Sequence, residues 1–122
     1  MLMHNFTRLI LPWPPTINHA YNFWRGRVVK KKAVNDFAKE VQAIVRRKGF
    51  EGFGTTPVAV AIQAFPPDRR RRDLDNIQKV LLDALQMAGC FDDDSQIDRL
   101  EIHRGPAMDG EGHVNVEIRE LI

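Results

Sequence analysis

The residues with the clearest chemical potential are four consecutive arginines, Arg69 to Arg72, that stand immediately before two acids, Asp73 and Asp75. Guanidinium groups bind phosphate oxygens, whereas clustered carboxylates suit a hard divalent cation. A surface that only bound DNA would not place acids there, because they repel the phosphates that the arginines attract. The combination indicates one site that holds a polyanion and a divalent cation together. That is the situation of a metal-dependent nuclease.

Lys79 and the acidic run Asp92-Asp93-Asp94 extend this pattern. If the backbone is extended at Asp73 and Asp75, residues two apart point the same way and both carboxylates can converge on one ion, Mg²⁺ or Mn²⁺. Lys79 follows Asp75 by one helical turn, where its ammonium group could neutralise charge on the reacting phosphate or orient the attacking water. Asp94 lies past the far end of the same predicted helix, roughly 20 Å away. It can join Asp73 only if the acidic loop folds back or if the catalytic face lies alongside the helix.

Simpler interpretations of these charges stay open at this point. Asp75 could serve only as a helix cap, with Lys79 as a surface ion-pair partner worth about 0.3 kcal/mol. The run Asp92 to Asp94 could be a solvated acidic turn, since it lacks the ligand spacing of an EF-hand. The arginine run could be a solvated face, although four arginines that abut acids are an odd route to solubility. Spacing alone supports the metal site and the simpler interpretations of the acids about equally, while the arginine run is less ambiguous.

A second candidate surface is the segment from Thr16 to Lys32, which shows no clean period and is predicted to be a long functional loop with a short strand at 27–29. Aromatic and basic side chains alternate in and just before it, as suits unstacked bases and phosphates. The aromatics could instead close the core, and for Trp13 we favour that interpretation. The aromatic residues are Trp13, Tyr21, Phe23 and Trp24, and the expected DNA-binding residues are Arg25, Arg27, Lys30, Lys31 and Lys32.

The elements that must position these residues follow from hydrophobic periodicity, caps and breakers. Asn35 is the expected cap of a first helix that ends before Gly49, and Asp75 is the expected cap of a second helix that ends before Gly89. The last two strands are predicted to pair with each other in antiparallel fashion. The order is β-α-β-α-β-β, an α/β (α+β) sandwich with a mixed sheet of about four strands and two helices on one face. The predicted strands are 6–11, 57–65, 97–103 and 113–118.

Length and composition limit the class of protein. The chain has 122 residues, 43% hydrophobic and 28% charged, which fits one globular domain spanning residues 1–122. A formal net charge of only +2 means that its basic character is local. We interpret the single cysteine, Cys90, as structural, and with no membrane-spanning run or signal peptide we expect a cytoplasmic protein. The histidines lack zinc spacing; they are His4, His19, His103 and His113.

One long motif resembles the RusA family of Holliday-junction resolvases. It runs from Pro67 through the arginines to Lys79, continues in register at Asp83-Ala84-Leu85, Gly89 and Asp93-Asp94-Ser95-Gln96, and is accompanied by Leu11 to Thr16, Asn18 and Arg25-Gly26-Arg27. The resemblance covers nearly the whole chain and is weaker in the first helix and after Ile102. Cys90-Phe91-Asp92 departs from it, because bulky aromatic residues are expected there.

The resemblance implies a small homodimeric endonuclease that binds four-way DNA junctions and cuts two strands symmetrically, in recombination and repair. It implies a requirement for Mg²⁺, with Mn²⁺ as a substitute, no nucleotide cofactor and no membrane partner. The family's catalytic and metal-binding acids fall on Asp73, Asp75 and Asp94, and its catalytic lysine on Lys79. A bacterial or phage source, including a prophage, is expected. The competing functions are a non-catalytic junction-binding module and an interaction domain whose arginines meet an acidic protein.

Overall fold

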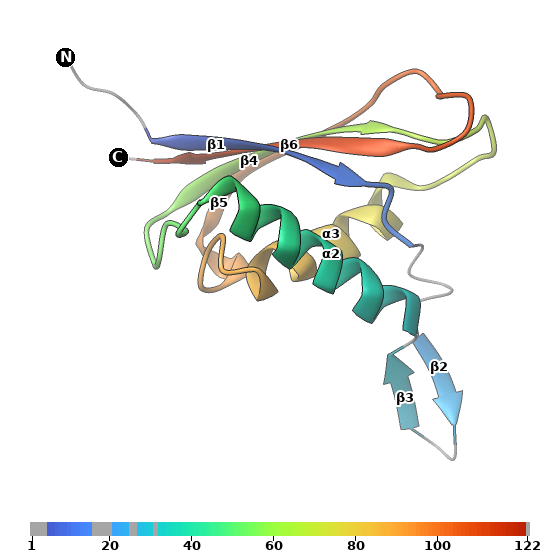
Figure 1. Cartoon of the computed structure of the whole chain (residues 1–122), viewed down its shortest axis with the longest axis horizontal. Coiled ribbons are helices and arrows are strands. Elements are labelled where there is room, and N and C mark those ends of the chain that lie inside the picture. The colour runs from blue at the N-terminus through green and yellow to red at the C-terminus, as the bar shows by residue number, and fades with distance from the viewer. Residues whose placement is uncertain (1–4, 16–20, 25–26, 31, 122) are drawn as a thin grey trace.

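The computed structural model describes residues 5–15 and 32–121, together with the backbone of residues 21–24 and 27–30. Figure 1 shows one layer of strands with two helices on one side of it. The elements in chain order are β1 (Phe6–Pro12), β2 (Tyr21–Trp24), β3 (Arg27–Lys30), α2 (Lys32–Lys48), β4 (Val58–Phe65), α3 (Leu74–Met87), the 3₁₀ turn η1 (Asp94–Gln96), β5 (Ile97–Arg104) and β6 (His113–Glu120). The predicted fold class is confirmed.

The main sheet has the strand order β1-β6-β4-β5. β6 pairs antiparallel with both β1 and β4, while β5 pairs parallel with β4. The prediction that the last two strands form an antiparallel pair is therefore wrong. β6 is a central strand, and its Val114, Val116 and Ile118 are buried on the face that the helices cover. β5 is mostly exposed and lies at the edge, and α3 supplies the long crossover that a parallel β4–β5 pair needs.

The core lies between the sheet and the two helices. β4 alternates strictly, so that Val58, Val60, Ile62 and Ala64 face the helices and are almost fully buried. Each such aliphatic side chain contributes about 1.5–3 kcal/mol when it leaves water. The helices return an apolar stripe to this face, which includes Val34, Phe37, Val41, Ile77, Leu81 and Leu85. This two-layer arrangement fixes the direction of α3, and α3 in turn positions Asp73 and Asp75 at its start.

The first helix begins earlier than predicted. Asn35 is not its cap, because α2 starts at Lys32 and Asn35 lies within its first turn. The reason is Val34, which is 5% exposed and joins the buried stripe, so that burial extends the helix beyond the local capping signal. The segment predicted to be a long loop contains an antiparallel β2–β3 hairpin, which Figure 1 shows beyond the first turn of α2. The short strand expected at 27–29 is part of it.

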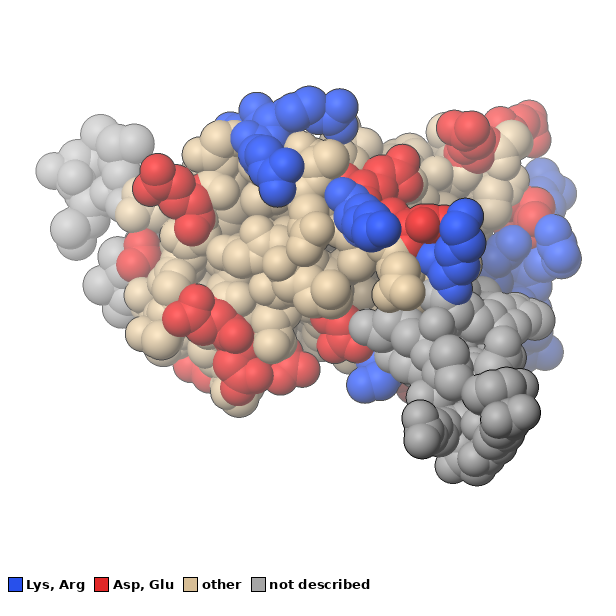
Figure 2. All heavy atoms as spheres, turned by 60° about the horizontal axis from the view of Figure 1, so that its bottom comes forward, with Lys and Arg blue, Asp and Glu red and all other residues tan. Residues whose placement is uncertain are grey.

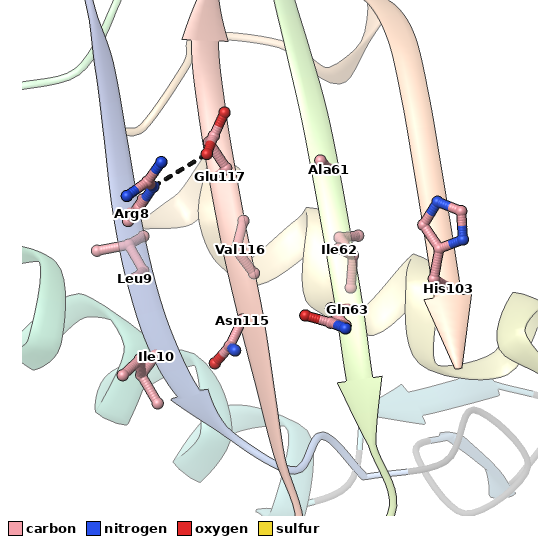
Figure 3. Close-up of a pocket in the computed structure, with 10 residues that line it drawn as sticks. All are labelled: Arg8, Leu9, Ile10, Ala61, Ile62, Gln63, His103, Asn115, Val116 and Glu117. Atoms are coloured by element: carbon pink, nitrogen blue, oxygen red, sulfur yellow. Dashed lines mark hydrogen bonds and ion pairs between the residues drawn. The ribbon is translucent and has the colours of Figure 1, made fainter. Parts of the chain in front are cut away.

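The sheet face that points away from the helices carries a hollow of about 440 Å³. Figure 3 shows Ile10, Ala61, Gln63 and Asn115 along it, with the only carboxylate of the lining, Glu117, directed toward Arg8. The Arg8 Nε–Glu117 Oε2 distance is 3.0 Å, and Arg119 also binds Glu117. Because its one acid is already paired, this hollow offers no metal-binding pair of carboxylates. Across the described residues, neither helix has the length and apolar character needed to cross a bilayer.

Candidate functional site

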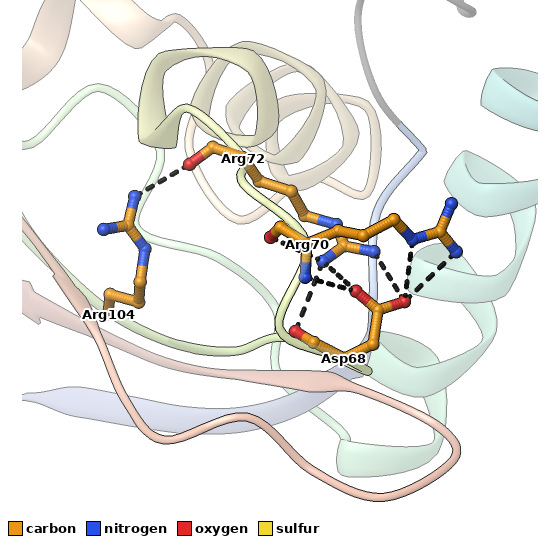
Figure 4. A network of polar contacts seen from close by, with 4 residues as sticks. All are labelled: Asp68, Arg70, Arg72 and Arg104. Carbon is orange, nitrogen blue, oxygen red and sulfur yellow. Dashed lines mark hydrogen bonds and ion pairs between the residues drawn. The ribbon is translucent and has the colours of Figure 1, made fainter.

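Residues 66–72, which lie in the connection between β4 and α3, carry all four consecutive arginines and form the arginine loop. At its centre the Asp68 carboxylate accepts hydrogen bonds from Arg72 Nη1 at 2.7 Å and Nη2 at 3.1 Å (Figure 4). It also accepts from the backbone N–H of Arg70 at 2.9 Å and from Arg70 Nε at 3.2 Å. The hydrogen bonds from Arg72, and next the one from the Arg70 backbone, hold the pKa of Asp68 far below its usual range. Asp68 is therefore ionised at any pH at which the protein would act.

Arg72 stabilises the arginine loop through hydrogen bonds within the loop. Its side chain is only 17% exposed, and its Nη1 also donates to the carbonyl oxygens of Asp68 and Arg70. Its guanidinium carbon lies 5.7 Å from the ring centroid of Trp13, at cation–π distance. Trp13 itself packs against the core, as predicted. Arg72 thus links the residue that follows β1, the arginine loop and the start of α3, while Arg69, Arg70 and Arg71 remain exposed.

A hollow of about 340 Å³ opens beside this loop. Figure 2 shows basic and acidic side chains together at the right-hand end of the molecule, where Figure 1 places the β4–α3 connection. The lining consists of five arginines and one acid: Arg69, Arg70, Arg71, Arg72, Arg104 and Asp73. Such a surface is suited to a phosphate group and lies next to a carboxylate that could hold a cation.

Arg104 is the residue that the sequence reasoning missed. It ends β5, and its Nη2 donates to the carbonyl oxygen of Arg72 at 2.8 Å. The sequence alone carries no signal for this contact, which depends on the parallel pairing of β4 and β5, because strands that run side by side in the same direction end at the same edge of the sheet. β4 leads into the arginine loop there. The mistaken β5–β6 hairpin concealed this neighbour.

Asp73 and Asp75 stand at the start of α3. Asp73 occupies the N-cap position in an extended conformation and makes no side-chain capping bond. The prediction that Asp75 caps the helix is wrong, since Asp75 lies within the first turn. Both acids are exposed, and the helix dipole favours negative charge at this end. Neither carboxylate has a hydrogen-bond or ion-pair partner in the described part of the chain, which leaves both able to bind a cation.

Lys79 lies on α3 one turn after Asp75, and its side chain is exposed. The alternative that the two residues merely form a surface ion pair is not supported, because no such pair is present among the described residues. The Lys79 ammonium group is instead on the same side of the helix as the Asp75 carboxylate and faces solvent. It is placed where it could meet a substrate that also contacts Asp75.

The acidic loop, residues 90–96, is held at the other end of α3. Cys90 and Phe91 are fully buried and anchor it to the core, and burial raises the pKa of the Cys90 thiol to about 12. This agrees with a structural role for Cys90. Gln96 organises the exposed part, because its Oε1 accepts from the backbone N–H groups of Asp92 and Asp93 while its Nε2 donates to the carbonyl oxygens of Gly54 and Thr56. The loop is thus a built structure rather than a freely solvated turn.

Asp94 does not reach the other two acids within one chain. Its backbone N–H donates to Gln86 Oε1 at 3.0 Å, and Gln86 is in the last turn of α3. A helix of this length separates its ends by about 20 Å, and Figure 1 places the acidic loop and the arginine loop at opposite ends of α3. Among the described residues, no three His, Cys, Asp or Glu side chains are grouped to hold a metal ion. The fold-back that would bring Asp94 to Asp73 is absent.

The basic residues of the N-terminal surface are only partly described. Arg25 and Lys31 lie outside the described residues. Arg27 and Lys30 belong to β3, whose backbone alone is described. Lys32 opens α2, is exposed, and forms an ion pair with Asp36 at 3.3 Å. Their expected contacts with DNA stay predictions.

Replacing Gln96 with leucine is expected to destabilise the acidic loop. The substitution keeps the size of the side chain but leaves two backbone N–H groups and two carbonyl oxygens without these partners. At about 0.5–1 kcal/mol for each of the four lost bonds, the free energy of unfolding should fall by about 2–4 kcal/mol. Urea unfolding followed by circular dichroism measures this loss. Gln63→Leu on the open sheet face is the matched control, and an equal loss there would contradict the special role of Gln96.

Comparison with known proteins identifies the family of this chain. The profile of the endodeoxyribonuclease RusA family matches residues 12–119. The chain therefore belongs to that family of endonucleases. It is 37% identical over 121 residues to the crossover junction endodeoxyribonuclease RusA of Enterobacteria phage HK97, covering 96% of this chain and 97% of that protein. It is 35% identical over 117 residues to the proteins of the same name from Escherichia coli K12 and Enterobacteria phage 82, with the same coverage.

Proposed function

We propose that this protein is a metal-dependent endodeoxyribonuclease that resolves four-way DNA junctions by paired symmetric nicks during recombination and repair. The names of its relatives, crossover junction endodeoxyribonucleases, supply the substrate class. The observation that carries the proposal is the placement of Asp73, which has no side-chain partner among the described residues, in the lining of a hollow with five arginines, and of Asp75 two residues further on in the first turn of α3. That arrangement can bind a phosphodiester and a divalent cation at once.

The cofactor proposed is Mg²⁺, with Mn²⁺ as a substitute. The available donors fit it, because they are exposed carboxylates, and no histidine or cysteine is among the described residues that line the hollows around Asp73. Asp73 and Asp75 would hold the ion, and Asp94 would complete the set. When bound, such a cation polarises the scissile phosphate and lowers the pKa of a coordinated water.

The remaining residues bind and orient the DNA strand. Arg69, Arg71 and Arg104 would contact phosphate oxygens, since their guanidinium groups line the hollow. Arg70 and Arg72 also belong to the predicted DNA-binding set, but both are engaged by Asp68, so their main contribution is to shape the loop. Lys79 would stabilise negative charge that develops on the phosphate. Lys32 and the basic residues near the β2–β3 hairpin would contact neighbouring strands.

The incomplete acid set supports a homodimer in which each subunit completes the other's site. Asp75, Lys79, Asp83 and Gln86 follow one another at helical spacing on the solvent side of α3, from the arginine loop to the acidic loop. If two copies of α3 lie antiparallel across a two-fold axis, the partner subunit's Asp94 comes beside Asp73 and Asp75. A two-fold dimer also provides two identical sites for two strands.

Cleavage of a synthetic four-way junction tests the proposed function. In Mg²⁺ or Mn²⁺ the junction should be cut by two symmetric nicks, and EDTA should abolish cutting because the acids alone cannot activate water. A linear duplex of the same sequence is the control and should be cut far more slowly. Cutting that is equal with and without EDTA would exclude the metal mechanism. Salt-sensitive junction binding without nicks would identify a non-catalytic binding module instead.

A further inference from the structure

Asp68 is the one acid of the arginine loop, residues 66–72. Its carboxylate is only partly exposed, and its two oxygens accept four hydrogen bonds from Arg70 and Arg72. Figure 4 shows both arginine side chains directed toward this one carboxylate. The bidentate bond to Arg72 is the geometry that holds a guanidinium group in a fixed plane.

An acid at this position has an electrostatic cost for a protein that binds DNA. A carboxylate inside a phosphate-binding surface repels the phosphate and removes one unit of positive charge from it. On charge alone, the loop would bind DNA better without Asp68. Asp68 offsets this cost because it fixes the positions of Arg70 and Arg72.

The contacts divide the arginines into two kinds. Arg70 and Arg72 are held by Asp68, whereas Arg69 and Arg71 are exposed and have no ion-pair partner within the described residues. Arg72 is fixed a second time through its carbonyl oxygen, which accepts from Arg104. Because Arg72 directly precedes Asp73, the residue at the N-cap of α3, fixing Arg72 fixes the backbone that presents the Asp73 carboxylate.

We propose that Asp68 is a positioning residue for DNA cleavage. It anchors Arg70 and Arg72, and this holds Arg69, Arg71 and the Asp73 carboxylate where all three can contact the same phosphodiester. The inference rests on the proposed nuclease function. Asp68 touches neither the metal nor the scissile phosphate in this scheme. It acts by holding the arginine loop in one conformation, as residues that hydrogen-bond to metal ligands hold those ligands in place.

The variant Asp68→Asn separates positioning from charge. Asparagine has nearly the same shape and keeps an acceptor for the Arg70 backbone, but it loses the charge-assisted bidentate bond to Arg72. Positioning predicts that the single-turnover cleavage rate of a bound junction falls about 10- to 100-fold, while affinity for linear duplex stays equal or rises. Asp68→Glu, which retains the charge, should recover part of the rate. Asp109→Asn is the matched control, because Asp109 is exposed and unpaired among the described residues.

Two results would overturn this inference. One is an Asp68→Asn variant that cuts at the wild-type rate or loses no more than Asp109→Asn. The other concerns the loop directly and does not depend on cleavage: the Arg70 Nε–H resonance should be protected from exchange in the wild type and lose protection in Asp68→Asn. An unprotected wild-type signal would remove the basis of the inference. If the wild type failed to cut any junction, the proposed function would fail while this measurement still decided whether Asp68 orders the loop.

Discussion

Asp73→Asn should lower the rate of junction cleavage by at least about 100-fold. The variant should still bind the junction as tightly as the wild type or more tightly. The change removes one carboxylate of the proposed metal site and one repulsion toward phosphate. Asparagine is as good an N-cap as aspartate, so α3 should keep its start and the free energy of unfolding should change by less than about 0.5 kcal/mol. Cleavage with Mg²⁺, junction binding in EDTA and urea unfolding measure the three quantities separately.

A control isolates the position from the charge. Asp98 is exposed on β5, and Asp98→Asn makes the same chemical change away from the arginine hollow. It should cut at close to the wild-type rate. If Asp73→Asn loses binding together with cleavage, the residue serves the fold of the loop rather than the ion. If it cuts normally, Asp73 does not hold the metal.

Two inactive variants, Asp73→Asn and Asp94→Asn, are expected to regain cleavage when their subunits are exchanged into a heterodimer. In the proposed dimer each site combines Asp73 and Asp75 of one subunit with Asp94 of the other. One site of the heterodimer then carries both substitutions, and the second carries none. The restored enzyme should nick one strand of each junction instead of two, a gain of at least about 100-fold over either parent. Mixing by co-expression and scoring nicks on labelled strands measures this result.

The matched control for this exchange pairs Asp73→Asn with Asp75→Asn. These two acids belong to the same subunit's half of the site, so both sites of that heterodimer stay damaged and no cleavage should return. If the Asp73→Asn and Asp94→Asn pair also remains inactive although heterodimers form, the three acids are not shared between subunits. The proposed assembly would then be wrong, even if each residue is individually required.

The elements of the fold could be predicted because each carries its own local pattern. The alternation of β4 and the apolar stripe of α3 identify a strand and a helix without reference to the rest of the chain. Strand partners could not be predicted in the same way. β5 and β6 are successive in the sequence and joined by one loop, which favours a hairpin, yet β6 pairs with β1 on one side and with β4 on the other. That preference emerges only when all strands compete for the helix-covered face.

The candidate site shows the same division. Residue types alone led us to expect a metal and a phosphate, which stay predictions, and Asp73, Asp75 and Lys79 are exposed at the start and in the first two turns of α3. The sequence could not show that Asp68 binds two of the four arginines, because this depends on how the loop turns back on itself. Nor could it show that Gln96 and Gln86 fix the acidic loop, since their partners are backbone groups. These contacts depend on the folded backbone, so no pattern of residue spacing in the sequence predicts them.

The length of α3 would set the geometry of the whole dimer if each site combines Asp73 and Asp75 of one subunit with Asp94 of the other. The 14 residues of this helix set the distance between the arginine loop and the acidic loop of one chain, and across the two-fold axis they set the distance between the two reaction centres. α3 would then act as a ruler for the spacing of the paired nicks. An insertion of one helical turn would misalign both centres at once and would be as damaging as the loss of an acid. Selection would hold the length of this helix as firmly as its charged residues.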